Sequence, residues 1–414
     1  MNKVFPRNRV IFSRDNLLKI RECYRKDQII EGPDVGVFEK MFASYIRAKY
    51  AVSFSSARSG LITILGALNF HPGDEIILPA YTFHVIPAII KSQGLKPVFV
   101  DIRNDTYTIN TSLIEKSITK KTKAIFATHI LGHPCDMDDI MALSQKYNLK
   151  ILEDCAHACG AEYKGQKVGS FGIASIFSFG MGKLMNCFGG GMVTCQDEDL
   201  RDRILEKRRF YENFSKIQLF KHMVKFFVFC FLTNPKVFAV TGYVVMRIAQ
   251  VFHNDIFDRI PNEPVKLWHQ FPKTFFRKFT NVQAAIGIQQ LESLDENINK
   301  IIGNTAIYFR KLAGSGLDLP FVNPEVKHVY LYFRIRLQRR EKLKQKLLEY
   351  GVDIKKDDIA VCPELDIFSE SDKNYPVAKE VSRTSLELPC YYSLSEGDIH
   401  QITEEITKSL GHFV

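Results

Sequence analysis

Short apolar segments rich in β-branched and aromatic residues alternate with helical patterns over residues 45–200. The runs that predict strands are YAVSFSS (50–56), EIILPA (75–80), KPVFVDI (96–102), KAIFATHI (123–130), KILED (150–154) and ASIFSF (174–179). Helical patterns lie between most of them, as in DMDDIMALSQKYN (136–148). This alternation predicts an α/β fold with a mostly parallel sheet covered by helices. Ligands bind at the carboxyl ends of such strands, where Asp154, Ser178 and the Ser55–Ser56 turn are expected.

The pattern changes after residue 280. Residues 281–314 predict one long helix, and VYLYFRIRL (329–337) alternates as a strand does. Further helices are expected over 340–351, ending at Gly351, and over 393–410, with Ser393 or Ser395 as the cap. We therefore expect an N-terminal segment and large domain over 1–280, and the connecting helix with a smaller α+β domain over 281–414.

Residues 215–254 fit neither domain. The segment has no acidic residue and carries Lys216, Lys221, Lys225, Lys236 and Arg247. Its charge-free runs, 226–235 and 237–246, are too short for a membrane span of about 20 residues. Two apolar helices hinged at Asn234–Pro235, with basic residues beside them, suit an anionic membrane interface. A buried helical hairpin, a lid or a dimer contact is the alternative, and the sequence leaves the choice open.

Composition and charge narrow the classes of function. The chain has 414 residues, 46% of them hydrophobic and 25% charged, as in ordinary globular proteins. The net charge of +10 suits an anionic membrane or phosphorylated substrates, whereas no Lys/Arg block indicates nucleic acid. Nine scattered cysteines lack paired metal spacing, so we expect reduced thiols and no metal. The N-terminus has no apolar signal core, which favours a cytoplasmic protein, peripheral on the inner face of the cell membrane if 215–254 binds lipid.

Lys183 stands in FSFGMGKLMNCFGGGMVTC (177–195), a segment with no other charge. An unpaired ammonium is costly to bury, and the cost falls when the amine is neutral or held in a Schiff base. A solvated loop lysine is the alternative if this segment is taken alone.

Other motifs stand before and after this lysine. They are GPDVGVFEKMFASYIRAKYAVSFSSARSGL (32–61), DEIILPAYTFHVIPAI (74–89), THILGHPCDMDDIMAL (128–143), EDCAHACGAEYKG (153–165), NVQAAIGIQQLESLD (281–295) and LELPCYYSLSEGDI (386–399). In this order the chain, apart from roughly 213–270, resembles the DegT/StrS-type sugar aminotransferases, fold-type-I enzymes that use pyridoxal 5'-phosphate (PLP). The resemblance implies that fold, a homodimer with active sites at the subunit interface, and Lys183 as the Schiff-base lysine.

The resemblance also implies which residues surround the cofactor ring. Asp154 in EDCAHA matches the carboxylate that holds the proton of the pyridine nitrogen, and its neighbour Glu153 should point to the opposite side of the strand. His157 matches the residue that hydrogen-bonds the phenolic oxygen. Phe83 in PAYTFHVIP matches the aromatic residue that stacks on the ring.

For the phosphate, the resemblance implies a second group of residues. Ala57 and Arg58 in SSARSGL offer backbone amides in a turn that opens a helix, where phosphates bind. Ser178, five residues before Lys183, matches the phosphate-binding serine. Arg58 is at the same time a departure, since the family has a small residue there.

Two further departures lie on the substrate side. The family often has Gly-Glu-Gly-Gly after the lysine, but this chain has Phe188-Gly189-Gly190-Gly191, without the acid. A motif of Asn-Tyr-Arg-Met type, whose Asn reaches the phosphate of the other subunit, is replaced by FFRKFTN (275–281), with Phe276 in that place. Arg277 and Lys278 beside it are the expected contacts to the substrate or the partner subunit.

The resemblance implies a PLP-dependent aminotransferase. It would move an amino group from an amino acid, with glutamate the expected donor, to a keto sugar or related ketone, nucleotide- or lipid-linked. Lys183 would hold the cofactor and then, as a free amine, move the proton. One alternative is another PLP reaction such as a dehydration, which some members perform with a histidine in place of the lysine; Lys183 argues against it. The other is a non-catalytic, membrane-associated scaffold.

Overall fold

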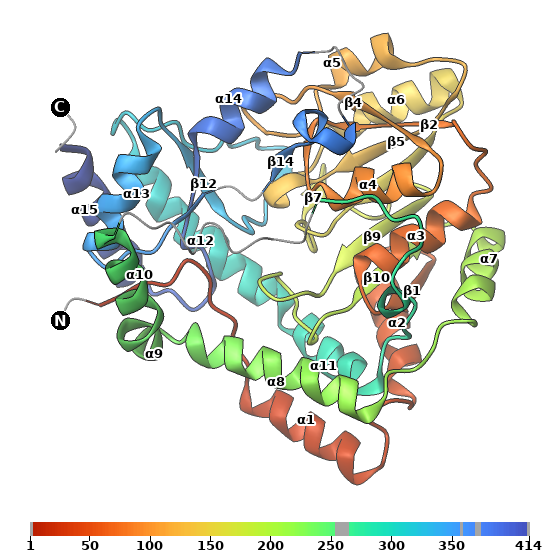
Figure 1. Cartoon of the computed structure of the whole chain (residues 1–414), viewed down its shortest axis with the longest axis horizontal. Coiled ribbons are helices and arrows are strands. Elements are labelled where there is room, and N and C mark those ends of the chain that lie inside the picture. Colours follow the sequence, from red (N-terminus) through yellow and green to blue (C-terminus); the bar gives the residue numbers. More distant parts are fainter. Residues whose placement is uncertain (1–2, 253–264, 357–358, 369–373, 412–414) are drawn as a thin grey trace.

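The computed structural model describes residues 3–252, 265–356, 359–368 and 374–411 (Figure 1). Its centre is a seven-stranded sheet in which the six expected strands are all present within one or two residues of their expected bounds. In spatial order the strands are β1 (Tyr50–Phe54), β10 (Gly191–Cys195), β9 (Ala174–Ser178), β6 (Lys150–Asp154), β5 (Thr122–Thr128), β2 (Glu75–Pro79) and β4 (Lys96–Val100).

Strand β10 was not expected, and it is antiparallel to both of its neighbours. Its first residue, Gly191, pairs with Ser178 on one side and with Phe54 on the other. A Cβ atom on Gly191 would lie only 2.4 Å from the amide nitrogen of Ala57. Glycine is required here because the strand passes directly against the turn that opens helix α3 (Ala57–Ala67).

Helices cover both faces of this sheet. Because side chains alternate along a strand, Ile76 and Leu78 of β2 join the core cluster under one set of helices, whereas Ile77 joins the cluster on the other face. The first set is α3, α4 (Val85–Ser92) and α7 (Glu198–Arg208), and the second includes α2 (Asp34–Ile46) and α6 (Met137–Tyr147). The expected α/β architecture is confirmed.

The smaller C-terminal part departs from the sequence expectation in two places. The helix expected over 281–314 is two helices, because the chain breaks at Ser293, and the strand expected over 329–337 covers only four residues. Ser395 is the cap of the last helix, since its hydroxyl accepts from the Asp398 N–H at 3.2 Å. The elements are α11 (Asn281–Glu292), α12 (Leu294–Leu312), β12 (Phe333–Arg336), α13 (Arg340–Glu349), β13 (Lys355–Lys356), β15 (Ser385–Leu388) and α15 (Glu396–Gly411).

The two expected domains exchange segments across the boundary near residue 280. Phe5, from the N-terminal end, is buried in the core of the C-terminal part and forms a bridge to Val352. In the other direction, β14 (Ala360–Val361) pairs with β3 (Tyr81–Thr82), and α14 (Pro376–Thr384) packs on the core of the large sheet. The division at 280 therefore separates most, but not all, of the two cores.

The segment 215–254 folds as three helices up to the end of the described part at residue 252: α8 (Lys216–Leu232), α9 (Pro235–Val240) and α10 (Gly242–Val251). In Figure 1, α8 crosses the lower edge of the molecule alongside α1 (Arg14–Arg25) and α11, and α9 and α10 lie beside the C-terminal part. The side chain of Asn234 accepts from the Lys236 N–H at 3.1 Å and caps α9, which confirms the hinge.

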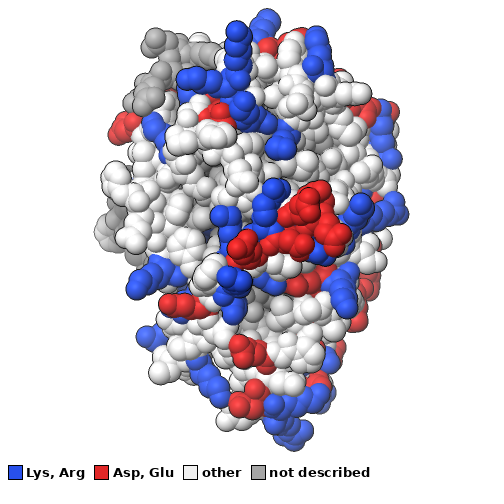
Figure 2. All heavy atoms as spheres, turned by 90° about the vertical axis from the view of Figure 1, so that its right-hand side faces the viewer, with Lys and Arg blue, Asp and Glu red and all other residues white. Residues whose placement is uncertain are grey.

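None of the described helices is by itself long and apolar enough to cross a bilayer. Helix α8 and the run 235–251 reach the required length and composition only together, and they are bent by 74°. Figure 2 views the side on which α7 lies and shows Lys/Arg and Asp/Glu side chains intermixed there. On this face the positive net charge is not gathered into one basic surface.

Candidate functional site

A cavity of about 560 Å³ lies at the carboxyl ends of β6 and β9, beside the N-terminus of α3. Eight of the nine expected site residues line it together, and Lys278 is the one outside it. The eight are Ala57, Arg58, Phe83, Asp154, His157, Ser178, Lys183 and Arg277.

Asp154 ends strand β6 and is 6% exposed. One of its carboxylate oxygens accepts from the Ala156 N–H at 3.0 Å, and no other hydrogen bond to this side chain occurs among the described residues. Burial raises the pKa of Asp154, opposed by the Ala156 hydrogen bond and by the positive charge of Lys183. A buried carboxylate with spare acceptor capacity is suited to hold a cation within the cavity.

Glu153 points the other way, as expected from strand alternation. Its two oxygens accept from the backbone N–H groups of Gly169, Phe171 and Gly172, from the Ser175 hydroxyl and from the His129 ring. His129, Glu153 and Cys155 bring metal-ligand atoms within 4.8 Å of one another, but these hydrogen bonds already occupy the Glu153 carboxylate. Glu153 is therefore a structural residue that holds the loop between β8 (Gln166–Lys167) and β9.

His157 presents a neutral imidazole to the cavity. Its Nδ1 accepts from the Leu131 N–H at 3.3 Å, so the ring proton is on Nε2. Burial lowers the pKa of His157 well below its ordinary value, and the charges of Lys183, Lys355 and Arg334 act in the same direction. The free side of the ring is thus a hydrogen-bond donor.

The N-terminus of α3 forms an anion-binding corner of the cavity. The Ser56 hydroxyl accepts from the Ser59 N–H at 3.2 Å and caps the helix, which leaves the amides of Ala57 and Arg58 at its positive end. The hydroxyls of Ser55 and Ser178 line the same cavity. This corner offers the amides and hydroxyls that a phosphate group would need.

Two buried hydroxyls support the fit of the expected cofactor. Thr82 and Thr128 line the cavity, and their buried Oγ1 atoms have no hydrogen-bond partner within the described structure. Buried polar groups are normally paired, so their position favours a polar ligand. With the aromatic ring of Phe83, the Asp154 carboxylate and the phosphate corner, the residues fit PLP.

Sequence reasoning missed the residues that the C-terminal part and α8 add to this cavity. Lys355 and Glu387 lie 3.8 Å apart (Nζ to Oε2), and the Lys355 ammonium lies 5.1 Å from the centre of the Tyr332 ring. Gln218 and His222 of α8 also line it. No local signal marks them, because Lys355 stands in a charged run typical of a solvated face.

Arg277 lines the same cavity as Lys183. Its guanidinium contacts the Glu212 carboxylate at 2.7 Å and donates to the Asn213 carbonyl at 2.9 Å. The Phe276 ring packs edge to face on Tyr211 at 5.3 Å. The expected contacts of Arg277 and Lys278 with a partner subunit stay a prediction.

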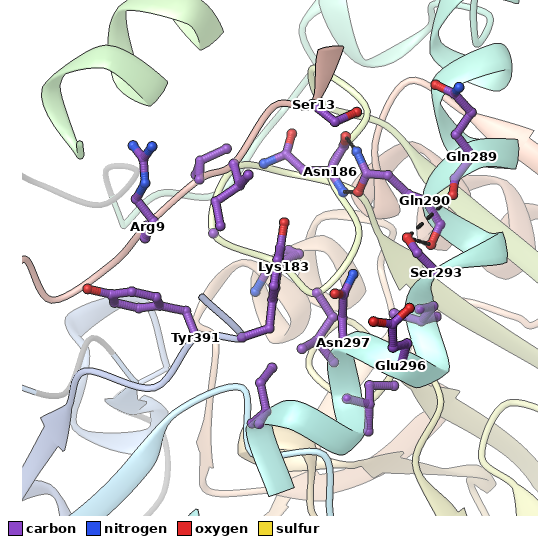
Figure 3. Close-up of a pocket in the computed structure, with 18 of the residues that line it drawn as sticks. Arg9, Ser13, Lys183, Asn186, Gln289, Gln290, Ser293, Glu296, Asn297 and Tyr391 are labelled. Atoms are coloured by element: carbon purple, nitrogen blue, oxygen red, sulfur yellow. Dashed lines mark hydrogen bonds between the residues drawn. The ribbon is translucent and has the colours of Figure 1, made fainter. Parts of the chain in front are cut away.

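A second cavity, of about 450 Å³, lies beside the lysine loop, the connection between β9 and β10 that carries Lys183 (residues 179–190). Figure 3 shows Lys183 in its centre, between Tyr391 on one side and Asn186 and Gln290 on the other. Most of its polar lining is neutral amides and hydroxyls, and the Asn186 side chain has no partner among the described residues. Lys183 therefore lines two cavities, and only the first contains Asp154 and the phosphate corner.

Comparison with known proteins agrees with this geometry. The family model of the DegT/DnrJ/EryC1/StrS aminotransferase family matches residues 12–407. GDP-perosamine synthase of Escherichia coli O157:H7 is 31% identical over 393 residues, which cover 94% of each chain. A Streptomyces venezuelae transaminase, named for dTDP-3-amino-3,4,6-trideoxy-alpha-D-glucose, is 30% identical over 324 residues, 78% of this chain and 72% of that one. The solved aminotransferase from Psychrobacter cryohalolentis superposes with a TM-score of 0.79 at 26% identity, covering 97% of this chain and 98% of that one.

Proposed function

The chain belongs to the DegT/DnrJ/EryC1/StrS aminotransferase family, and we propose that it uses PLP to transfer the amino group of glutamate to a keto sugar. The observation that carries this proposal is the convergence of Lys183, Asp154 and His157 with the N-terminus of α3 on one cavity. The names of the two curated relatives, both concerned with amino sugars, support a sugar as the acceptor.

PLP, when bound, would supply an electron sink for the carbon that loses a proton. The amides of Ala57 and Arg58 would bind its phosphate at the positive end of α3. The Asp154 carboxylate would hold a proton on the ring nitrogen by charge attraction, and His157 Nε2–H would donate to the phenolic oxygen. Phe83 would cover one face of the ring and exclude water from it.

Lys183 has two roles in this proposal. Its Nζ would hold the cofactor through a covalent bond at rest. As a free amine, Nζ would take the proton from the donor's α-carbon and return it on the other side of the transfer. A lysine at this position also disfavours the dehydration performed by relatives with a histidine there.

The proposal includes a homodimer and a cytoplasmic location on an anionic membrane surface. For the dimer the support is the resemblance of the motifs at 275–281, with Arg277 and Lys278 as contacts to substrate or partner. For the location the support is the segment 215–254, which is free of acidic residues and exposes apolar side chains of α8 and α10.

A spectroscopic experiment tests the transaminase proposal. Protein loaded with PLP is expected to absorb near the visible edge, to lose that band on addition of glutamate, and to regain it with a suitable keto sugar. Loss of the band with borohydride marks the covalent link to lysine. If the protein binds no PLP, it is a scaffold and not an enzyme. If no amino acid removes the absorbance band of the PLP-loaded protein, it is not a transaminase.

A further inference from the structure

Helix α8 carries four kinds of side chain on four sides. An α-helix turns about 100° per residue, so residues three or four apart share a side. One side is buried: Leu219 and Phe226 pack with Val10, Phe188 and Val282. A second side is apolar and exposed to solvent. Two lysines form the third side, and the fourth lines the cavity of Lys183 with Gln218 and His222.

The exposed apolar side runs along the whole helix. Ile217, Phe220, Val224, Val228 and Phe231 are spaced by three or four residues and are 69%, 65%, 43%, 50% and 62% exposed. A surface helix of a soluble protein normally has polar side chains in these positions. Helix α10 repeats the arrangement, with Met246 buried and Val244, Val245, Ile248 and Val251 exposed. Such a continuous apolar surface indicates an apolar partner.

The charges around this surface favour a lipid bilayer over a second copy of the chain. Lys221, Lys225 and Lys236 are exposed, and none of them pairs with a carboxylate in the part of the chain that the structure describes. If α8 lay on the axis of a two-fold dimer, this surface would face its own copy and bring these lysines together, which is repulsive. An anionic bilayer offers both the apolar layer and the negative headgroups that this helix lacks.

The lysines lie between the bilayer side and the cavity side. Going around the axis from Val224, the order is Val228, Lys221, Lys225, Gln218 and His222, by the turn per residue of an α-helix. Lys221 precedes His222 directly, so the two are separated by about 1.5 Å along the axis. A ligand with a lipid, a phosphate and a sugar in this order therefore matches the order of side chains on α8.

We infer that the acceptor is a lipid-linked keto sugar, taken from an anionic membrane on which α8 lies. Its lipid contacts the apolar side of α8, its phosphate binds Lys221 and Lys225, and its sugar enters the cavity beside Lys183. This inference rests on the proposed transaminase function and adds the substrate class and the side from which it enters.

Vesicle binding tests the surface. PLP-loaded protein is sedimented with phosphatidylcholine vesicles with and without phosphatidylserine, at low and high salt. We expect binding to the anionic vesicles that falls with salt, and a loss of about 30-fold or more in affinity for the double variant Lys221→Glu/Lys225→Glu. The matched control is Lys120→Glu/Lys121→Glu, which makes the same charge change in the exposed loop before β5 and should bind as the wild type does.

The variant Val224→Asp/Val228→Asp tests the exposed apolar side of α8. It distinguishes a lipid bilayer from a second copy of the chain as the partner of that side. Loss of vesicle binding with an unchanged oligomeric state supports the inference. Wild-type protein that ignores anionic vesicles at low salt, or a variant that turns a dimer into monomers while vesicle binding persists, overturns it.

A competition between acceptors tests the substrate class. Wild-type enzyme converted by glutamate is offered the same keto sugar linked to a nucleotide in solution or to a lipid diphosphate in vesicles. Faster return of the absorbance band with the lipid-linked form supports the inference, and equal or slower return overturns it. Failure of the glutamate step itself would instead contradict the proposed function, so the two failures are distinguishable.

Discussion

The rings of Phe188 and Phe226 meet edge to face with their centres 4.7 Å apart, and this contact joins the lysine loop to helix α8. Phe188 adopts a left-handed backbone with φ +59°, a conformation that suits glycine, the residue expected from the family pattern. The side chain is 4% exposed and also contacts Phe12 and Phe227. The departure from the family at 188 is thus explained by the helix that is packed on it.

We predict that Phe226→Ala destabilises the protein by about 3–5 kcal/mol, because it removes a buried ring from this contact. Phe188→Gly should cost about 1–2 kcal/mol less than Phe188→Ala, since glycine relieves the left-handed strain. Urea unfolding measures each value. The control is Phe220→Ala at an exposed position of the same helix, which should change stability by about 0.5 kcal/mol or less. Equal effects of the glycine and alanine variants would exclude strain at 188.

Lys183→Ala should abolish the borohydride-sensitive band and turnover while the fold is retained. The reason is that Lys183 is the lysine that lines the cavity at the end of β9 beside Asp154. Lys355→Ala, which removes the other lysine lining this cavity among the described residues, is the matched control and should keep the band. Mass spectrometry after borohydride reduction locates the modified residue, and a reduced adduct on a different lysine would refute the assignment.

Asp154→Asn should bind PLP but lose about 10²–10³-fold in turnover, because a neutral amide cannot hold the proton of the ring nitrogen. The neighbouring Glu153 is expected to affect stability and not turnover. Glu153→Gln should lower the free energy of unfolding by about 1–3 kcal/mol, since it disturbs a carboxylate that accepts from three backbone amides. Single-turnover kinetics and urea unfolding separate the two effects. Near wild-type turnover of Asp154→Asn would remove this residue from the proposed role.

The stability of the cofactor-free protein should fall as the pH drops below about 6.5. Burial lowers the pKa of His133 to about 4, and it lowers the pKa of His157 and His328 well below the ordinary value. Their stabilising effect is complete above the unfolded pKa, because only the unfolded chain binds protons between the two values. Each histidine contributes a slope of about 1.4 kcal/mol per pH unit in this range. Urea midpoints from pH 7 to 5 should show it, and His133→Gln should reduce the slope; a flat profile would contradict neutral burial.

Sedimentation should show a homodimer, and replacement of Lys278 by Ala should lower acceptor turnover without loss of the glutamate step. The reason is that Lys278 lies outside the cavity of this chain, beside Arg277 that lines it, so we expect it to contact a partner subunit. A fully active monomer would contradict the dimer. An unaffected acceptor step in the Lys278 variant would remove that contact from the proposal.

Part of the site could be expected from local sequence, and the family resemblance supplied the rest. Alternating apolar runs determine strands, and a strand directs neighbouring side chains to opposite sides, so Asp154 enters the cavity and Glu153 leaves it. A serine before an apolar helix predicts a capped N-terminus, and the Ser56 cap leaves Ala57 and Arg58 at the cavity.

What surrounds that site depends on the tertiary structure. The sequence GMVTC does not reveal that β10 is antiparallel to its neighbours in the sheet. The position of β10 in the sheet depends on a tertiary contact, the close approach of Gly191 to Ala57. Lys355 reaches the cavity only because the C-terminal part folds back over it. In α8 both the buried side and one exposed side are apolar, so no period could tell the buried Phe226 from the exposed Phe220. The tertiary structure selects Phe226 for burial, because Phe188 and α11 pack against the side of α8 that carries it. A helix with two apolar sides buries the one for which the rest of the chain provides a partner.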